Sequence, residues 1–369
     1  MRYLGNKTRL LPFITGALER AGIAAGSAHD AFAGTASVGR ALKGAGWRVA
    51  SSDLMTYSYV FQRAYVVAQR APGFADLRAA EPELRRALTS ARFRAAAESR
   101  GVGALHQVAE FLARWIEPES GFVTAHFSPA GGRMYFTEEN ARRIDAVRAR
   151  LHRWREAGSI GDDAYYVLLA ALLEGADRVA NTAGVYAAFI KSWQANAKRA
   201  LDLLPVPPVR GASGSTAHLG DAADVARALG AVDLLYVDPP YNSRQYSGYY
   251  HVPEIIARGW FDEVPALGGK TGLPVRGASR SAWCDPRRAL PSLEALLAAT
   301  GAKHVLVSYN SEGHIAEGAL RRTLEEASVD GRVRRFARSY PRYRSDRDSA
   351  RRRYRDDALR ELLYHARLR

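Results

Sequence analysis

Four consecutive residues, Asp238-Pro239-Pro240-Tyr241, combine hydrogen-bond acceptors with an aromatic ring immediately after an apolar run. The run, Val232 to Val237, is typical of a buried strand, and open α/β sheets carry functional residues at the carboxyl ends of such strands. The prolines have fixed φ angles and no backbone N–H, so the carbonyl groups there remain as rigid acceptors. Together, the acceptors and the ring suit a planar group that carries an –NH2, such as the exocyclic amine of a nucleobase.

The same arrangement favours methyl transfer to that amine. The lone pair of a nucleobase amine is delocalised into the ring, which makes its nitrogen a poor nucleophile. Two acceptors that pull the amine hydrogens out of the ring plane free the lone pair to attack an electrophilic methyl group. The alternative is a purely structural turn after the strand, capped by Asp238.

A second stretch, "HDAFAGTASVGRALKGAG" from His29, predicts a ligand-binding loop between a strand and a helix. Small residues at Gly34, Ala36 and Gly39 let the backbone approach a ligand there. Asp53 ends the next expected strand about twenty residues later, where a carboxylate can accept both hydroxyls of a ribose. No Lys-Ser or Lys-Thr pair follows the glycines, so the loop is not a phosphate cradle. A structural turn also explains such glycines, but the pairing with Asp53 predicts an adenosine-bearing cofactor.

The elements that must position these residues alternate between helix and strand at both ends of the chain. We expect helices over residues 7–21, 37–44 and 291–299, and strands at 47–53, 217–222, 232–240 and 303–309, with another strand ending at Phe32. This alternation predicts an α/β fold with a mostly parallel sheet. From Leu54 to about Ala200, apolar residues instead recur at helical spacing, and Thr137 is the expected N-cap of one helix.

These patterns predict two domains. Residues 1–53 and 216–369 are expected to form the catalytic domain, and residues 54–215 an inserted helical domain with a linker. The linker, residues 203–216, is rich in Pro, Gly and Ser. Arg178, Asn181, Tyr186 and Lys191 in the helical block are the polar groups that we expect to contact nucleic acid, although internal hydrogen bonds could equally satisfy them.

Composition narrows the class of partner. The chain has 369 residues and a formal net charge of +15, which favours a polyanion, and nucleic acid before membrane. A soluble protein from an arginine-rich proteome is the alternative. Cys284 is the single cysteine, which excludes an intramolecular disulfide and a multi-cysteine zinc site, and no metal is expected.

The termini carry further signals. Arg2, Lys7 and Arg9 interrupt the apolar residues of the N-terminus, and the longest apolar run, residues 165–173, is too short to span a bilayer, so we expect a cytoplasmic protein. Residues 332–369 hold 14 arginines against 5 acids, interleaved with tyrosines, which suits nucleic acid or a solvated charge run equally well.

The motifs occur in an order that resembles a known family. "RYLGNKTRLLPFI", "DAFAGTASVGRALK", Asp53, "GDA" at Gly220 and "DPPY" follow one another as in adenine-specific DNA methyltransferases of the Dam-like class. "AGGRMYFTEENARRIDAVR", "DRVANTAGVYAAFIKSW" and "SYNSEG" are similar to the branch that includes the modification methylase of the Fok restriction system. The resemblance runs from Arg2 to about Gly313. One departure is Ala36, where the family usually has a second glycine.

The resemblance implies an S-adenosylmethionine-dependent enzyme with a Rossmann-like α/β domain and an inserted, mainly helical DNA-recognition domain. Double-stranded DNA would be the substrate, a cognate restriction endonuclease encoded nearby a possible partner, and no membrane is implied. The implied cofactor residues are Tyr3, Asn6 and Lys7 at the methionine end, Phe32, Gly34 and Thr35 around the cofactor, Asp53 at the ribose, Asp221 at the adenine, and Asp238. Asp238, Pro239, Pro240 and Tyr241 would act on the target adenine, with Arg244 and Tyr246 as further nucleic-acid contacts. The resemblance also implies a final strand near residues 361–366, where the spacing of apolar residues favours a helix.

Other functions stay open from the sequence. An RNA or cytosine-N4 methyltransferase could use the same acceptors, although cytosine-N4 enzymes more often carry serine at the position of Asp238. A cytosine-C5 enzyme needs a cysteine nucleophile, but Cys284 lies in "SAWCDP" beside a tryptophan and is expected to be packed. An inactive DNA-binding subunit would have no need of Lys7, Asp53 and Asp238 together.

Overall fold

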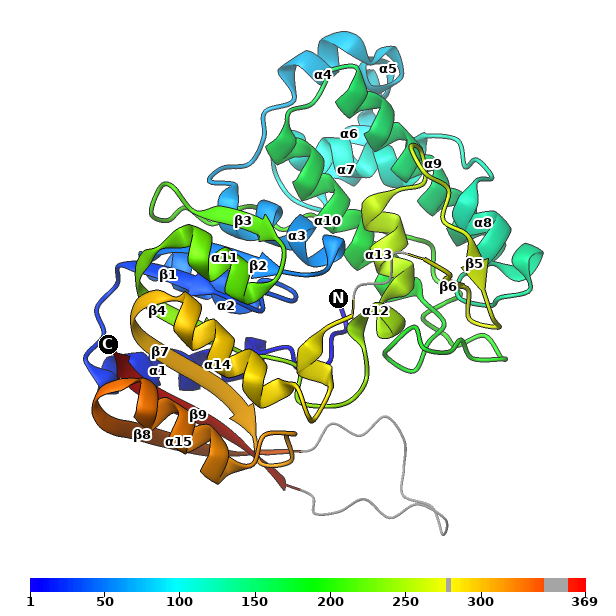
Figure 1. Cartoon of the computed structure of the whole chain (residues 1–369). Helices are drawn as coiled ribbons and strands as arrows, with labels where there is room; N and C mark the ends of the chain where they lie inside the picture. Colours follow the sequence, from blue (N-terminus) through cyan, green and yellow to red (C-terminus); the bar gives the residue numbers. More distant parts are fainter. Residues whose placement is uncertain (277–279, 342–357) are drawn as a thin grey trace. The chain divides into compact units, whose positions relative to one another are not determined.

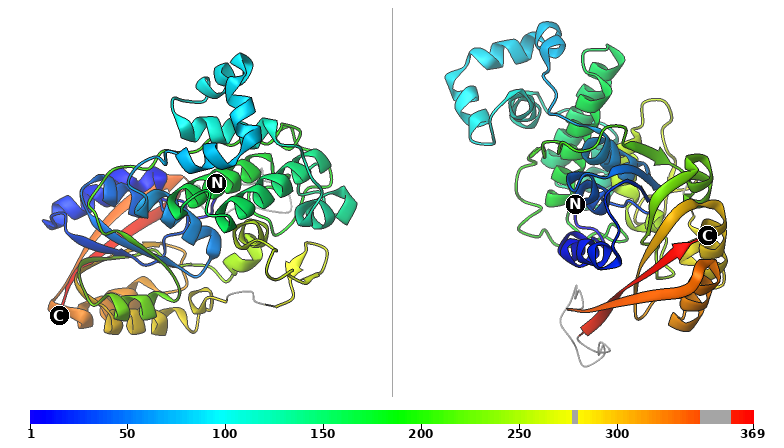
Figure 2. Two further views of the ribbon diagram at one scale, coloured as in Figure 1. Left: turned by 90° about the horizontal axis from the view of Figure 1, so that it is seen from above. Right: turned by 90° about the vertical axis from the view of Figure 1, so that its left-hand side faces the viewer.

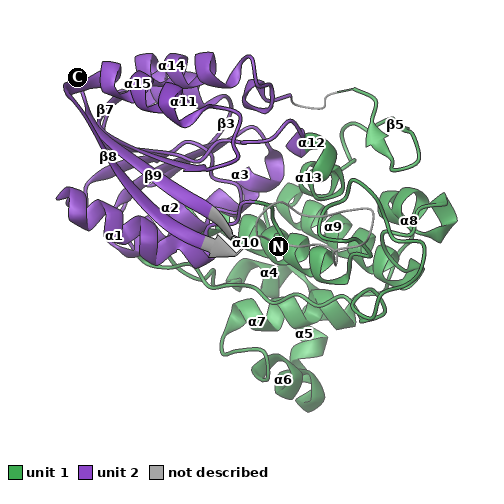
Figure 3. Ribbon diagram, turned by 90° about the horizontal axis from the view of Figure 1, so that it is seen from below, with its two compact units in different colours: residues 1–4, 63–210, 247–278 green, residues 5–62, 211–246, 279–369 purple. Residues whose placement is uncertain are grey.

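The computed structural model describes residues 1–276, 280–341 and 358–369, which form two compact units. The first, called here the helical unit, comprises residues 1–4, 63–210 and 247–278. The second, called the sheet unit, comprises residues 5–62, 211–246 and 279–369. Figure 3 shows the helical unit in green and the sheet unit in purple.

The sheet unit is built around one mixed sheet that has seven strands among the described residues. Their spatial order is β3 (Thr216–Leu219), β2 (Arg48–Asp53), β1 (Ser27–Asp30), β4 (Ala231–Val237), β7 (Gly301–Asn310), β9 (Ala358–Leu368) and β8 (Ser328–Pro341). The strands from β3 to β7 pair in parallel, whereas β9 is antiparallel to both of its neighbours. The prediction of an α/β fold with a mostly parallel sheet is confirmed.

Helices cover both faces of this sheet. They are η1 (Thr8–Leu10), α1 (Leu11–Ala21), α2 (Ser37–Gly44), α3 (Thr56–Gln62), α11 (Ala222–Leu229), η5 (Ala282–Cys284), α14 (Ala289–Ala299) and α15 (Glu317–Ala327). Helices α11, α14 and α15 lie on one face and α1 and α2 on the other (Figure 3). Leu235 of β4 and Val305 of β7 are paired and fully buried under the first group, as expected for central strands of a parallel sheet.

The end of the chain is a strand, as the resemblance implied, and not a helix. β9 pairs with β7 on one side and β8 on the other, and the hairpin of β8 and β9 is orange and red in Figure 2. Pairing on both sides satisfies the backbone and overrides the helical spacing of the apolar residues. Tyr364 is buried in this sheet, so it offers no ring for stacking on a base. Tyr343 and Tyr354, with most of the basic tail, lie outside the described residues.

The helical unit packs its helices around a core of its own. Its elements are η2 (Arg63–Val67), α4 (Ala75–Ala80), α5 (Pro82–Thr89), α6 (Ala91–Glu98), α7 (Ala104–Glu110), η3 (Phe111–Trp115), α8 (Phe122–Phe127), η4 (Pro129–Gly131), α9 (Glu138–Glu156), α10 (Asp162–Val179), α13 (His251–Arg258), β5 (Leu267–Gly268) and β6 (Leu273–Pro274). Helix α12 (Tyr246–Tyr249) spans the boundary in the sequence between the units, and most of the elements are labelled in Figure 1. The Thr137 hydroxyl accepts a hydrogen bond from Asn140 N, which confirms the predicted N-cap of α9.

The compact units differ from the predicted domain limits at four places, two of which are the short segments 1–4, in the helical unit, and 211–215, in the sheet unit. Residues 54–62 belong to the sheet unit because α3 packs against β2 and β3. Residues 247–278 belong to the helical unit, where α13 packs against α10. Within the described part of the chain, no helix is long and apolar enough to cross a membrane.

Candidate active site

The carboxyl ends of the parallel strands bring the predicted motifs to one edge of the sheet. Asp53 is the last residue of β2, and Asp238 follows the last residue of β4. Asp30 ends β1 and Asn310 ends β7. Because parallel strands share this edge, the expectation that the Asp-Pro-Pro-Tyr segment follows a buried strand is confirmed.

A buried lysine lies beside the acid of that segment. Lys7 immediately precedes η1 and is only 3% exposed, whereas the Asp238 side chain remains 13% exposed. Lys7 Nζ is 3.1 Å from Asp238 Oδ1 and 3.5 Å from Glu361 Oε2. One ammonium group therefore serves two carboxylates, and it fixes Asp238 in place at the sheet edge.

The charged groups in this cluster shift one another's pKa values. Burial raises the pKa of Asp238 to about 6; the Lys7 ammonium opposes this rise, and the Glu361 carboxylate adds to it. Burial disfavours the charged form of Lys7, but the carboxylates of Asp238 and Glu361 outweigh burial and hold the Lys7 pKa well above its ordinary value. Lys7 is therefore a permanent cation, while Asp238 titrates just below neutral pH.

Glu361 was not anticipated from the sequence. It lies near the start of β9, far along the chain from the other motifs, and it pairs in register with Asn310 at the carboxyl end of β7. Because β9 runs antiparallel to β7, the first residues of β9 reach the same edge as the last residues of β7. No local pattern around residue 361 signals this, since the segment predicts a helix by its apolar spacing.

The loop after β1 and the acid that ends β2 contact each other. Gly34 N donates to Asp53 Oδ2 at 2.9 Å, and Met55 N donates to Asp53 Oδ1 at 3.0 Å. Burial raises the pKa of Asp53, although these hydrogen bonds oppose the rise. Further hydrogen bonds from the Ser58 hydroxyl and the Leu54 backbone also reach Asp53, so the carboxylate is held in one orientation at the strand end.

Ala36 shows why a glycine is usual at its position. Its φ of 57° and ψ of 24° lie in the left-handed region, directly before α2, and its side chain is fully buried. A non-glycine residue in this conformation costs roughly 1–2 kcal/mol relative to glycine. The chain tolerates this strain at the turn that forms the expected cofactor loop.

Of the other predicted cofactor residues, Asn6 contacts this loop and Phe32 belongs to it. Asn6 Nδ2 donates to Thr35 Oγ1 at 3.2 Å, and Phe32 meets the buried Trp283 edge to face, with centroids 5.0 Å apart. Asp221 is exposed and caps α11 by accepting from Ala223 N at 2.9 Å. Tyr3 belongs to the helical unit, where its ring stacks on Tyr250 at 5.0 Å.

Asp30, like Glu361, is a carboxylate at this edge that was not predicted from the sequence. It is buried, accepts from Gly39 N at 3.0 Å through Oδ2, and its Oδ1 lacks a well-formed hydrogen bond within the described residues. Burial and the charge of Asp238 raise the pKa of Asp30 to about 7. Its place at a strand end, two residues before Phe32, is the signal that could have singled it out.

Aromatic side chains line the other side of the Asp-Pro-Pro-Tyr segment. Pro239 is buried, Pro240 is partly buried, and Tyr241 meets Tyr309 edge to face at 6.2 Å. Lys7 Nζ lies 5.7 Å from the centroid of the Tyr241 ring. The Tyr241 and Tyr246 hydroxyl groups both lie within 4 Å of the position that a Cβ on Gly5 would occupy.

Cys284 has no features of a nucleophile. It is buried, burial raises its pKa to about 11, and its thiol donates to the exposed Arg244 at the backbone oxygen, 3.4 Å away. A thiol that stays protonated at neutral pH does not form covalent adducts readily. The expectation that Cys284 is packed is confirmed, and the cytosine-C5 alternative loses its nucleophile.

The predicted nucleic-acid residues of the helical unit divide into buried and exposed pairs. Asn181 is fully buried, donates to the Met134 and Ile190 carbonyls, and accepts from Gln194 N. Tyr186 is also buried, and its hydroxyl donates to Asp177 Oδ1 at 3.4 Å. For these two the alternative of internal hydrogen bonding holds, and neither offers a free edge to a base. Arg178 and Lys191 are exposed.

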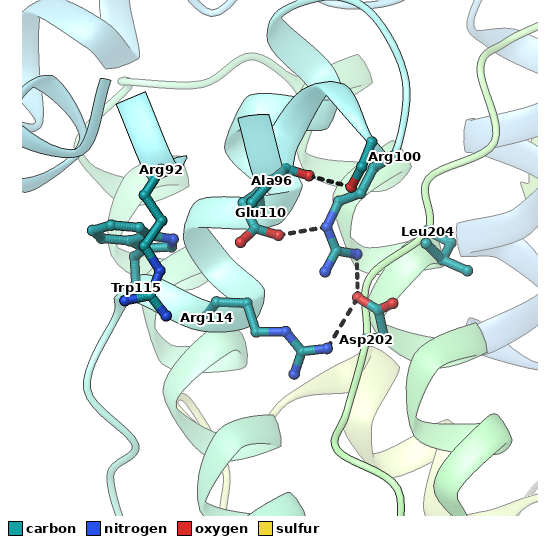
Figure 4. A pocket seen from close by; sticks show the side chains of 9 residues that line it. Arg92, Ala96, Arg100, Glu110, Arg114, Trp115, Asp202 and Leu204 are labelled. Atoms are coloured by element: carbon teal, nitrogen blue, oxygen red, sulfur yellow. Dashed lines mark hydrogen bonds and ion pairs between the residues drawn. The ribbon is translucent and has the colours of Figure 1, made fainter. Parts of the chain in front are cut away.

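A cavity of about 750 Å³ in the helical unit gathers further cationic groups (Figure 4). Its lining residues are Arg92, Ala96, Ser99, Arg100, Glu110, Arg114, Trp115, Asp202 and Leu204. Arg100 forms ion pairs with Glu110 and Asp202, whereas Arg92 is exposed beside Trp115, whose side chain is 37% exposed. The lining residues come from three separate segments of the chain, so no local pattern in the sequence predicts this cavity.

Comparison with known proteins places this geometry in a family. Residues 3–270 match the family described as D12 class N6 adenine-specific DNA methyltransferase. The type II methyltransferase M.NlaIII of Neisseria lactamica is 33% identical over 356 residues, which cover 94% of this chain and 93% of that protein.

Two longer relatives show the same similarity. The modification methylase LlaI of Lactococcus lactis subsp. lactis is 32% identical over 357 residues, and the type II methyltransferase M.FokI of Planomicrobium okeanokoites is 31% identical over 353 residues. These alignments cover 95% and 94% of this chain but only 52% and 50% of the relatives, so the chain spans about half of their length. The resemblance to the adenine-specific enzymes and to the branch with the Fok methylase is confirmed. The mainly parallel sheet, with the Asp-Pro-Pro-Tyr segment at a strand end, agrees with this family. The chain therefore belongs to the D12 class of N6 adenine-specific DNA methyltransferases and methylates adenine in DNA.

Proposed function

We propose that the sheet unit transfers a methyl group from S-adenosylmethionine to the N6 amine of an adenine that has left the DNA double helix. The observation that carries this proposal is the position of Asp238, held by Lys7 at 3.1 Å at the carboxyl end of β4. The site needs no covalent intermediate, because orientation and electrostatic stabilisation are sufficient for displacement at a methyl group.

The residues of the site fit a cationic, adenosine-bearing cofactor. Within the sheet unit, Asp53 would hold the ribose and Asp221 with Phe32 the adenine, while Asn6, Thr35, Gly34 and Lys7 would lie along the remainder. Tyr3 stays an expected cofactor residue on the resemblance alone. The buried oxygen of Asp30 that lacks a well-formed hydrogen bond suits an ammonium group. Lys7 pairs with Asp238 and Glu361, and its one positive charge is fewer than the three acids Asp30, Asp238 and Glu361 at this edge. When bound, the cofactor supplies an electrophilic methyl group.

The chain's own residues would orient the target amine. A paired adenine has its amine engaged with thymine and its ring within the stack, so the base must flip out at a cost of a few kcal/mol. Stacking on Tyr241 recovers about 1–3 kcal/mol of that cost. Asp238 and the Pro239 carbonyl, with Pro240 keeping the turn rigid, accept the two amine hydrogens as positive charge develops on the nitrogen.

A product assay tests this proposal against its alternatives. The purified protein is incubated with methyl-labelled S-adenosylmethionine and double-stranded DNA, and the DNA is digested to nucleosides. We expect the label in N6-methyldeoxyadenosine alone. Label in N4-methylcytosine, or in RNA offered in parallel, would establish an amino-methyltransferase of the other kind. DNA binding without any labelled nucleoside would establish an inactive DNA-binding subunit.

The role of Asp53 gives a prediction about cofactor affinity. Asp53→Ala should weaken S-adenosylmethionine binding by about 1–3 kcal/mol, because the ribose hydroxyls lose their acceptor. Isothermal titration calorimetry measures this directly without DNA. Asp224→Ala is the matched control, since Asp224 is an exposed acid of α11 that pairs with Arg227 on its own helix. Equal affinities for Asp53→Ala and the control would remove Asp53 from the cofactor site.

We further propose that the helical unit, with Arg244 and Tyr246 of the sheet unit, contacts double-stranded DNA, and that a cognate restriction endonuclease accompanies the enzyme. The names of M.NlaIII and M.FokI as type II methyltransferases support the second point. The exposed Arg178 and Lys191, together with the exposed Arg92 of the cavity, support the first.

Salt dependence tests the DNA contact. The double variant Arg178→Ala, Lys191→Ala should flatten the slope of log affinity against log salt by roughly 1–2, because each lost phosphate contact changes the slope by about 0.9. Lys303→Ala serves as the control, since Lys303 is exposed at the start of β7, at the amino edge of the sheet. An identical slope for wild type and the double variant would exclude both residues from the DNA interface.

A further inference from the structure

Glu361 is a carboxylate of the active-site edge that lies beyond the residues matched by the family, which end at 270. It is 7% exposed, and its Oε2 is 3.5 Å from Lys7 Nζ. We propose that Glu361 is a positioning residue: it fixes the Lys7 ammonium beside Asp238 and thereby sets the pH range over which Asp238 accepts the target amine. This inference rests on the proposed role of Asp238.

Geometry supports a positioning role. A lysine side chain has four flexible bonds and loses about 2 kcal/mol of rotamer entropy when it is fixed. One carboxylate would hold the ammonium from one side only, whereas Asp238 after β4 and Glu361 on β9 hold it from two separate strands. The strand β7 lies between β4 and β9, so the distance between the two anchors is set by hydrogen-bonded strands and not by a loop.

The charged and titratable groups around Asp238 support the proposed effect on the pH dependence of activity. Lys7 is the cation that faces Asp238, and Glu361 of β9 and Asp30 of β1 are the acids coupled to it. Tyr236 and Tyr241 are the nearby phenols, and they stay protonated because burial raises the pKa of each. On β7, the group that faces Asp238 is the uncharged hydroxyl of Ser308. Glu361 is therefore the group whose charge can be removed without changing the partners of the target amine.

The main test compares pH profiles of wild type and Glu361→Gln. Wild-type kcat/KM should fall as the pH drops through about 6, since protonation of Asp238 removes the acceptor. In Glu361→Gln the like charge is gone, so Asp238 should stay ionised to lower pH. The low-pH side of the profile, called here the acid limb, should therefore shift to lower pH by about 0.5–1 unit. The looser Lys7 should also lower kcat by about tenfold.

Two further variants separate charge from packing. Glu361→Asp keeps the charge, so its acid limb should stay with that of wild type while kcat falls because the shorter side chain reaches Lys7 less well. If Glu361 acts through Lys7, adding Glu361→Gln to Lys7→Met should cause no further loss of kcat, since the two effects are not additive. Circular dichroism and the thermal midpoint establish that each variant is folded.

Glu317→Gln is the matched control. Glu317 forms an ion pair of 2.8 Å with Arg335 in the same unit, but both side chains are exposed, so its acid limb should equal that of wild type. A Glu361→Gln enzyme with wild-type kcat and acid limb overturns the inference. A uniform loss of activity with an unmoved acid limb also overturns it, because that result shows only a structural role.

A Glu361→Gln variant that misfolds, or a wild-type protein without activity, also gives a defined answer. If Glu361→Gln does not fold, Glu361→Asp decides, and full wild-type kcat in that variant refutes positioning. A wild-type protein that yields no N6-methyldeoxyadenosine refutes the proposed function and this inference with it. An active wild type with an unaffected Glu361→Gln enzyme refutes this inference alone.

Discussion

Asp238→Ala is expected to lower the turnover of DNA adenine methylation by at least about 100- to 1000-fold while DNA binding stays near that of wild type. The loss is expected to be this large because, in the proposed mechanism, Asp238 is a preorganised acceptor for charge that develops only in the transition state, and removal of one such partner typically has this effect. Single-turnover methylation of a duplex under saturating cofactor measures the chemical step, and a gel-shift titration measures DNA binding.

The control for Asp238 comes from the same strand. Asp233 near the start of β4 accepts hydrogen bonds from Ser27 and forms an ion pair of 2.7 Å with Lys303 at the opposite edge of the sheet. Asp233→Ala should therefore lower stability but leave turnover per folded molecule unchanged. Near-normal turnover of Asp238→Ala on duplex DNA would refute the acceptor role of the Asp-Pro-Pro-Tyr segment.

Lys7→Met should lower the free energy of unfolding by about 3–5 kcal/mol at neutral pH, because it leaves the carboxylates of Asp238 and Glu361 buried without their cation. The loss should depend on pH in a defined direction. Without Lys7 the folded-state pKa of Asp238 rises further above its unfolded value, so the native state binds protons that the unfolded state does not. The variant should therefore regain stability as the pH falls from 8 toward 5.

Urea denaturation of wild type and Lys7→Met at pH 8 and pH 5 measures both effects. Lys303→Met is the control: it breaks a lysine–aspartate pair in the same unit, but Lys303 is 72% exposed, so only a small change is expected. If Lys7→Met and Lys303→Met lose the same amount of stability, or if the loss for Lys7→Met is independent of pH, the buried three-charge cluster is not what holds Asp238.

The main parts of the site were predictable because they follow from local patterns. An apolar run followed by Asp-Pro-Pro-Tyr, and a loop of small residues followed by Asp53, each report a strand end within a few residues of sequence. Parallel strands bring such ends to one edge, so fold class and edge could be inferred together. The N-cap at Thr137 was predictable for the same reason, since a cap depends on the next three residues.

Burial could not be inferred in the same way. Asn181 and Tyr186 are polar residues in a segment that resembles a DNA-contacting one, yet both lie inside the helical unit with their hydrogen bonds satisfied by neighbours. Whether a polar side chain faces solvent or the core depends on which helices pack around it, and those contacts join residues that are distant in sequence.

Sequence alone thus determined the reaction class of this protein, because the residues of the Asp-Pro-Pro-Tyr motif are adjacent in the chain and lie together in any fold that places them at a strand end. Only the tertiary structure decided the electrostatic environment of that motif. Glu361 is 123 positions after Asp238 in the chain, and the antiparallel pairing of Asn310 with Glu361 brings it to Lys7. Strand register is a property of the whole sheet. The pairing of β9 with β7 on one side and β8 on the other outweighed the helical spacing of apolar residues that the segment shows on its own.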